Sequence, residues 1–172
     1  MLRTALITYL LAIIPTATCK PGIWCLNPRD GDKLASRYAD LIGAFTPAKA
    51  CEVLTPDFAA TSDSINAISG IPSGNVTYDS RDAFVAAQPC WPAVAMDVAA
   101  VVAVSCDTVV LRWTQRWADD PAEISGISVL VAIAEDDDWK IRRVWEEFNG
   151  LAVLESLKDV LGMWTCKASS SS

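Results

Sequence analysis

The sequence predicts an α+β domain in which helices pack on one face of a strongly bent antiparallel sheet. Helical patterns fill the first half of the chain, four strand-length runs follow from Val94, and acidic turn residues separate these runs. A chain of 172 residues with 52% hydrophobic residues can form one domain with a continuous core. A sheet bent in this way forms a cone, and the mouth of the cone is a natural pocket.

The N-terminus has the layout of a secretory signal peptide over residues 1–18. Arg3 supplies a positive charge, residues 5–14 are apolar, and small residues follow. The apolar run is too short to span a bilayer as a helix, although an N-terminal anchor is the alternative. We therefore expect a secreted, extracellular protein without membrane contact after signal removal. The folded domain would cover residues 19–167, and residues 168–172 would form a disordered serine tail.

Six cysteines suit disulfide bonding in an exported chain, and their spacing alone leaves the connectivity open. They are Cys19, Cys25, Cys51, Cys90, Cys106 and Cys166. No close pair of the C-x-x-C type is present, so we expect no metal site. The triplet Asn75-Val76-Thr77 is a glycosylation sequon in a loop rich in Gly, Pro and Ser, and it predicts a glycan on Asn75.

Charge and composition exclude several function classes. The net charge of -7 argues against a nucleic-acid partner, because such binding depends on Lys and Arg neutralising phosphates. The chain has no histidine, which excludes Ser-His-Asp and Cys-His nucleophile activation and the usual zinc sites. Carboxylates are then the best candidates for acid–base groups, and no cofactor is expected.

Capping residues and apolar spacing predict the helices. A helix over residues 33–43 would begin at Asp30 or Asp32, and a second would run from Thr46 to about Leu54. The other predicted helices cover residues 80–88 and 151–161, and residues 59–69 form an extended segment or a short strand pair.

The predicted strands cover residues 94–105, 108–117, 124–134 and 139–149. The last strand alternates residue types with period two. One face carries Trp139, Ile141, Arg143, Trp145, Glu147 and Asn149, and the other carries Lys140, Arg142, Val144, Glu146 and Phe148. The aromatic, carboxylate and amide groups of the first face suit a pocket lining, and equally a core with a satisfied polar edge.

The sequence resembles small fungal secreted proteins of the nuclear transport factor 2-like, or SnoaL-like, superfamily, and the resemblance lies in the order and spacing of several short motifs. The motifs are Cys25-Leu26, Tyr38-Ala39, Asp57-Phe58, residues 62–66, Cys106-Asp107, Arg112-Trp113, Gly126-Ile127 and Glu147-Phe148-Asn149. The resemblance implies a cone-shaped, cystatin-like roll with a deep apolar pocket. The superfamily mixes isomerases, dehydratases, epoxide hydrolases and cyclases with non-enzymatic binding modules.

The resemblance also implies that Cys25 pairs with Cys106, which leaves Cys51 with Cys90 and Cys19 with Cys166 for the remaining bonds. The transport role of the founding member does not carry over to an exported chain. The sequence departs from the dehydratase members because it lacks histidine.

Asp63 and Glu147 are the candidate catalytic groups. A carboxylate desolvated in an apolar cone would have a raised pKa and could move a proton on a hydrophobic substrate. The structural alternative for Asp63 is a corner residue that bonds to backbone, which we favour. For Glu147 the alternative is an ion pair with a cross-strand arginine such as Arg112.

The candidate ligand-binding residues are Arg112, Trp113, Trp145 and Asn149. Core packing is the more common role for tryptophans at strand spacing, and a strand-end asparagine more often bonds to backbone. Two functions therefore stay open. The preferred one is a secreted binding or interaction module for a small hydrophobic molecule, and the alternative is a cofactor-independent isomerase, dehydratase or cyclase. The oligomeric state is also open, with a dimer among the options.

Overall fold

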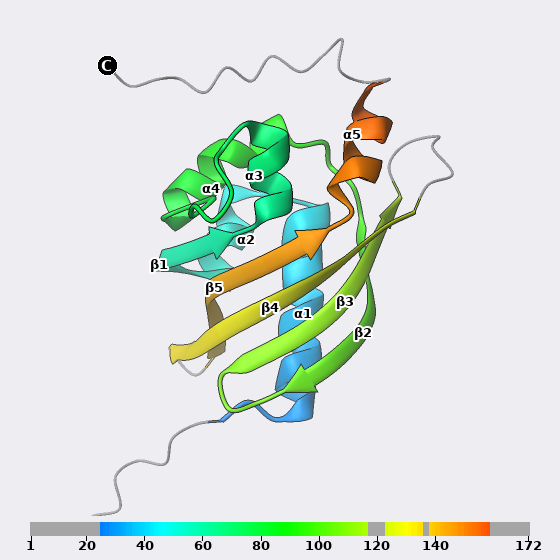
Figure 1. Ribbon diagram of the computed structural model, residues 1–172. Helices are drawn as coiled ribbons and strands as arrows, with labels where there is room; N and C mark the ends of the chain where they lie inside the picture. The colour runs from blue at the N-terminus through cyan, green and yellow to red at the C-terminus, as the bar shows by residue number, and fades with distance from the viewer. Residues whose placement is uncertain (1–24, 117–122, 136–137, 159–172) are drawn as a thin grey trace, which may run out of the picture.

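The computed structural model describes residues 25–116, 123–135 and 138–158. The predicted signal peptide, the serine tail, Cys19 and Cys166 lie outside these residues. The α+β fold class is confirmed: helices cover one face of a five-stranded sheet whose strand order is β1-β5-β4-β3-β2 (Figure 1). The strands are β1 (Leu54–Thr61), β2 (Met96–Val104), β3 (Thr108–Arg116), β4 (Glu123–Glu135) and β5 (Asp138–Phe148).

Helix α1 (Pro28–Gly43) crosses the sheet behind the strands in Figure 1. It begins earlier than predicted because Asn27, not Asp30 or Asp32, is the N-cap. The Asn27 side chain accepts hydrogen bonds from the backbone of Arg29 and Asp30, and the Asp30 carboxylate accepts one from the Asn27 backbone. The apolar face of α1, which includes Leu34, packs against the sheet.

The caps of two further helices are confirmed. Thr46 caps α2 (Pro47–Val53) by accepting a hydrogen bond from the Lys49 backbone. Ser80 caps α4 (Arg81–Ala87) in the same way, and a 3-10 turn over Gln88–Cys90 follows. The last helix, α5, covers Gly150–Lys158.

The segment predicted as extended over residues 59–69 divides into two elements. Its first part ends β1, which pairs in parallel with β5, and its second part is helix α3 (Asp63–Ser69), capped by Ser62. Strand β1 escaped prediction because it contains Pro56, which lacks a backbone donor. Such a residue is tolerated in an edge strand, and β1 is an edge of this sheet.

A register shift in β5 changes which side chains face the helices. Ile141 pairs with Ala132 and Arg143 pairs with Val131, so Arg142 is an extra residue between them. Beyond this shift, Val144, Glu146 and Phe148 point inward, while Arg143, Trp145 and Glu147 point outward. Strict alternation along the strand therefore placed Ile141 on the wrong face: it was predicted to share a face with Trp145 and Glu147, and it shares one with Val144 and Glu146.

The disulfide between Cys25 and Cys106 is confirmed and joins the start of α1 to the β2–β3 turn. The pairing of Cys51 with Cys90 is wrong. Cys51 is free and exposed on α2, whereas Cys90 is disulfide-bonded. Within the described ranges, no helix is long and apolar enough to cross a membrane.

Candidate functional site

A cavity of about 90 Å³ lies between α1, the α3–α4 region and the inner face of the sheet. Its lining is mostly apolar and includes the aromatic residues Phe58, Tyr78, Phe84, Trp91, Trp113 and Phe148. The volume is well below the roughly 300–1,000 Å³ of drug-sized ligand sites. It is also smaller than the about 150 Å³ of an engineered cavity that holds benzene, so only a compact molecule, or one end of a larger one, can enter.

The polar part of this cavity is built around Glu146, which is only 9% exposed. Its Oε2 accepts hydrogen bonds from the Tyr38 hydroxyl at 2.7 Å and from Ser128 Oγ at 2.6 Å. Trp113 Nε1 donates to Ser128 Oγ at 2.8 Å. Because an indole N–H can only donate, Ser128 accepts from Trp113 and its own proton points to Glu146.

The second oxygen of Glu146, Oε1, is available to a ligand. Both hydrogen bonds of the carboxyl group end on Oε2, and Oε1 has no partner among the residues with described side chains. When Glu146 is neutral its proton therefore resides best on Oε1, since Oε2 already accepts two hydrogen bonds. The neutral form offers the cavity a donor, and the ionised form offers it an acceptor.

Burial raises the pKa of Glu146, and this effect outweighs the hydrogen bonds from Ser128 and Tyr38, which lower it. The nearby Glu147 carboxylate adds to the increase. Burial also raises the pKa of Tyr38 well above its ordinary value, with the charge of Glu146 contributing, so Tyr38 stays protonated and donates. The cavity thus holds a carboxyl group whose raised pKa keeps it neutral to higher pH than an exposed glutamate.

Replacement of Glu146 by glutamine is expected to stabilise the protein at neutral pH and not near pH 4. A carboxyl whose pKa is raised on folding makes the folded state less stable as pH rises from the ordinary value of 4.5 through the raised one. Glutamine carries no such penalty and can still accept from Tyr38. The gain in free energy of unfolding at pH 7 should be about 1.4 kcal/mol for each unit of pKa increase.

Urea unfolding of both proteins across this pH range measures the difference. A gap between the two that stays constant with pH would contradict the raised pKa.

The structure places Asp63 and Glu147 away from the cavity. The Asp63 carboxylate accepts hydrogen bonds from the Gly74 backbone at 2.7 Å and from Ser73 Oγ at 2.6 Å, which lower its pKa and fix the loop after α3. The Glu147 carboxylate accepts from the backbone of Asp63 and Ser64 at the start of α3. Both carboxylates are engaged in holding local structure, and they do not converge.

The predicted ligand-binding residues separate into three groups. Trp113 is 2% exposed and lines the cavity. Arg112 and Trp145 lie on the opposite, outer face of the sheet. Asn149 accepts a hydrogen bond from the Ala152 backbone at the start of α5, which is the backbone role that we favoured.

Glu146 and Tyr38 are the groups that sequence reasoning missed. Glu146 was placed on the other face of its strand, because the extra residue at Arg142 has no clear sequence signal. Tyr38 was identified only as part of a helix motif. A carboxylate between two apolar inward positions, Val144 and Phe148, is the signal that could have revealed the site.

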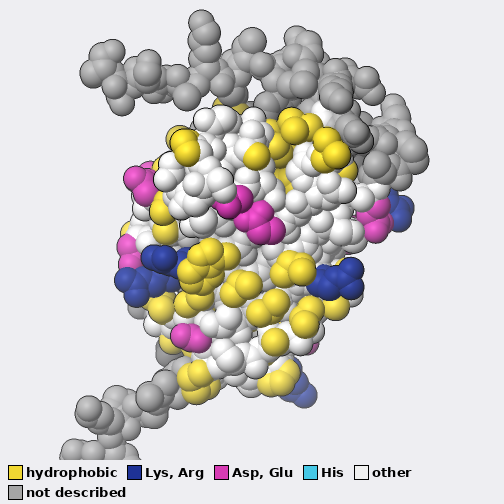
Figure 2. All heavy atoms as spheres, in the orientation of Figure 1, with side chains coloured by type: hydrophobic (Ala, Val, Ile, Leu, Met, Phe, Trp, Pro, Cys, Tyr) yellow, Lys and Arg dark blue, Asp and Glu magenta, His cyan; other side chains and the backbone are white. Residues whose placement is uncertain are grey.

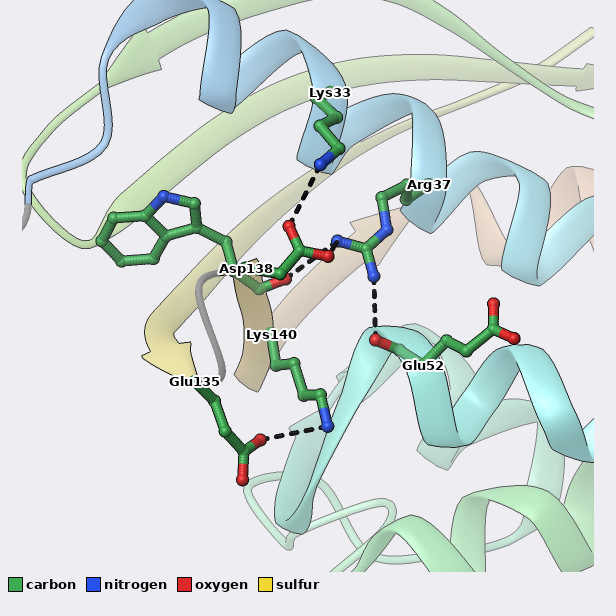
Figure 3. A network of polar contacts seen from close by, with 7 residues as sticks. Lys33, Arg37, Glu52, Glu135, Asp138 and Lys140 are labelled. Atoms are coloured by element: carbon green, nitrogen blue, oxygen red, sulfur yellow. Dashed lines mark hydrogen bonds and ion pairs between the residues drawn. The ribbon is translucent and has the colours of Figure 1, made fainter.

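A second hollow, of about 460 Å³, lies beside α1 and the start of β5. Its charges already have partners (Figure 3): Asp138 binds Lys33 at 3.1 Å and Arg37 at 2.8 Å, and Arg37 also donates to the Glu52 backbone. Lys140 pairs with Glu135 nearby. This network ties α1 to α2 and β5, and the charged groups of the larger hollow therefore have a structural role. We regard the smaller, mostly apolar cavity as the functional candidate. The described residues contain no cluster of metal-ligating side chains.

Comparisons with known proteins agree with the fold. The sequence matches the family model described as NTF2-like domain over residues 24–160. A search of curated proteins finds no significant match. Among solved structures, IdmH of Streptomyces antibioticus, a proposed polyketide cyclase, superposes with a TM-score of 0.55 at 14% identity, covering 74% of this chain and 98% of its own.

Two further structures are similar to the chain. A proposed SnoaL-like polyketide cyclase from Jannaschia sp. CCS1 has a TM-score of 0.56 at 16% identity, covering 76% of this chain and 94% of its own. A proposed ketosteroid isomerase from Kribbella flavida has a TM-score of 0.53 at 12% identity, covering 70% and 78%. At sequence identities this low, the superpositions establish a shared fold and nothing more.

Proposed function

The chain belongs to the NTF2-like domain family, and from this premise we propose that it binds one end of a mostly apolar molecule that carries an oxygen acceptor there, such as the carbonyl end of a cyclic ketone. The observation that carries the proposal is that Oε1 of Glu146 has no hydrogen-bond partner among the described side chains and lies in a mostly apolar cavity. A neutral carboxyl there donates to a carbonyl oxygen, while the aromatic lining packs on the ring. The related folds of proposed polyketide cyclases and a proposed ketosteroid isomerase are consistent with such a ligand.

Cyclohexanone is expected to bind more tightly than methylenecyclohexane, which has the same shape and no oxygen. Chemical-shift titration by NMR measures both affinities. The difference should be about tenfold, as one hydrogen bond in a buried site implies. Binding of the ketone should weaken as pH rises through the raised pKa of Glu146, because ionisation removes the donated proton.

Two variants at Glu146 separate its role from that of cavity shape. Glu146→Leu should reduce ketone binding to the level of the hydrocarbon, whereas Glu146→Gln should retain it, because the amide still donates. Equal affinity of the wild-type protein for the ketone and the hydrocarbon would contradict the proposal.

Proton transfer is a second candidate function, favoured by the pKa of Glu146. The ionised carboxylate would take a proton from the carbon beside the ligand's carbonyl, giving an enolate, and a proton from solvent would then return to that carbon. In D₂O this exchange would place deuterium beside the carbonyl of cyclohexanone, which NMR detects. If exchange occurs with the wild type and is lost in Glu146→Gln while binding persists, the protein is an acid–base enzyme. If the wild type gives no exchange above background, the protein binds the ketone without catalysing proton transfer.

We also propose that the protein works outside the cell. The Cys25–Cys106 disulfide supports an oxidising compartment. Asn75, the predicted glycan acceptor, is exposed in its loop. The signal peptide over residues 1–18 and the glycan remain predictions, and mass spectrometry of the protein secreted by a eukaryotic host tests both.

A further inference from the structure

Cys90 is bonded to a cysteine that lies outside the described residues. Cys90 is disulfide-bonded, and the Cys25–Cys106 bond uses two further cysteines. Cys51 is free. The chain has six cysteines, so the partner of Cys90 is Cys19 or Cys166. A bond from Cys90 to either of them excludes the expected pairing of Cys19 with Cys166.

The distance along α1 argues against Cys19. Cys25 is bonded to the β2–β3 turn beside the start of α1, and α3, α4 and α5 gather at the other end of the molecule (Figure 1). Gln88 and Trp91, which flank Cys90, line the cavity together with Ile42 in the last turn of α1. A helix of 16 residues is about 24 Å long. The six residues from Cys25 back to Cys19 extend by about 20–22 Å at most, which is less than the length of α1.

The chain that leads to Cys166 starts from the same end of the molecule as Cys90. Helix α5 packs on α3, and Val153 of α5 lines the cavity together with Gln88 and Trp91. Eight residues lead from Lys158, where α5 ends, to Cys166, and they extend by up to about 26–29 Å. This length is enough to cross from α5 to Cys90 over the rim of a small cavity.

Helix α5 exposes apolar side chains on the surface that this chain would cross. Leu151 is 65% exposed and Leu154 36%, whereas Val153 is buried. Figure 2 shows hydrophobic side chains gathered at the end of the molecule that carries α3 and α5. A helix of nine residues is too short to be stable without packing. The residues that follow α5 are rich in apolar side chains, which are Val160, Leu161, Met163 and Trp164.

We propose that a Cys90–Cys166 disulfide holds residues 159–165, the C-terminal strap, against α5 and across the rim of the cavity. The rim has Trp91 on one side and Val153 on the other, so a chain tied at both ends crosses between them. Burial of the strap's apolar side chains against the exposed leucines of α5 stabilises both segments. The bond forms when the two thiols pass two electrons and two protons to a small disulfide such as oxidised glutathione, which becomes two thiols.

Peptide mapping of the oxidised full chain tests the bond. After alkylation of free thiols, a protease that cleaves before aspartate releases Cys90 in residues 82–96 and Cys166 in residues 159–172. Cys19 and Cys25 stay together in the peptide that ends at Arg29. Mass spectrometry without reduction should find 82–96 joined to 159–172. A bond between 82–96 and the peptide that ends at Arg29 would overturn the proposal.

Hydrogen exchange of the oxidised protein tests whether the strap is held against α5. Cys90→Ser and Cys166→Ser break the same bond, so in both variants the amides of residues 150–158 should exchange at least tenfold faster than in the wild type. Cys51→Ser is the matched control, because Cys51 is free, and it should exchange like the wild type. Unchanged exchange in both bond variants would contradict the strap.

A variant that keeps the bond tests the apolar contacts separately. Leu161→Ser combined with Trp164→Ser leaves all cysteines in place and removes the two largest apolar side chains of the strap. Exchange over residues 150–158 should again be faster, and protection equal to that of the wild type would contradict the packing of the strap on α5. None of these measurements uses a ligand, so their outcomes are independent of what the cavity binds.

Discussion

Removal of the Cys25–Cys106 disulfide by a double substitution to serine is expected to lower the free energy of unfolding by about 4 kcal/mol. The bond joins cysteines 81 residues apart, and releasing so long a loop increases the entropy of the unfolded chain. Small domains are stable by only about 5–15 kcal/mol, so the variant should be close to unfolding at 37 °C. Urea unfolding monitored by circular dichroism gives the difference.

Cys51→Ser is the matched control. Cys51 is free and exposed, so its replacement should change stability by less than about 0.5 kcal/mol. A double variant at Cys25 and Cys106 that is as stable as this control would contradict the assigned role of the disulfide.

Gly126→Ala is expected to cost about 2–3 kcal/mol and to disturb the candidate site, although it adds only one methyl group. A Cβ at this position would overlap with Cζ2 of Trp113. The Trp113 indole is buried and fixed by its bond to Ser128, so it cannot move without breaking the chain of hydrogen bonds that leads to Glu146. Thermal unfolding should show the loss of stability, and near-ultraviolet circular dichroism should show a changed tryptophan environment.

Ser125→Ala, at the exposed neighbouring position of the same strand, should change neither signal. If Gly126→Ala has the melting temperature and the tryptophan spectrum of the wild type, Trp113 does not hold Glu146 in the way described.

The elements that sequence reasoning predicted are those with a local physical cause. Thr46 and Ser80 cap helices because their hydroxyls satisfy backbone donors only three residues away. The strands β2 to β5 alternate or are bounded by turn residues, and each pairs with its neighbour along the chain. Trp113, a ligand-binding candidate of the sequence, lines the cavity, whereas Trp145, which also lies on an interior strand, faces outward.

The features that escaped prediction depend on contacts distant in the sequence. Strand β1 forms because β5, more than 80 residues later, offers it a parallel partner. The extra residue at Arg142 moves Glu146 to the inner face and Glu147 to the outer one, and nothing local distinguishes the two carboxylates. Their surroundings do: Glu146 meets Tyr38 and Ser128 in an apolar cavity, and Glu147 meets the start of α3.

The central claim is that Glu146 is a buried carboxyl group with a raised pKa, and that its Oε1 is free to bind a ligand in the cavity. Its titration, followed through the side-chain carboxyl resonance in ¹³C NMR and assigned by the loss of that resonance in Glu146→Gln, tests the claim most directly. We predict a midpoint above the ordinary glutamate value of 4.5. A midpoint at or below that value would show a solvated or ion-paired carboxylate and would contradict the account.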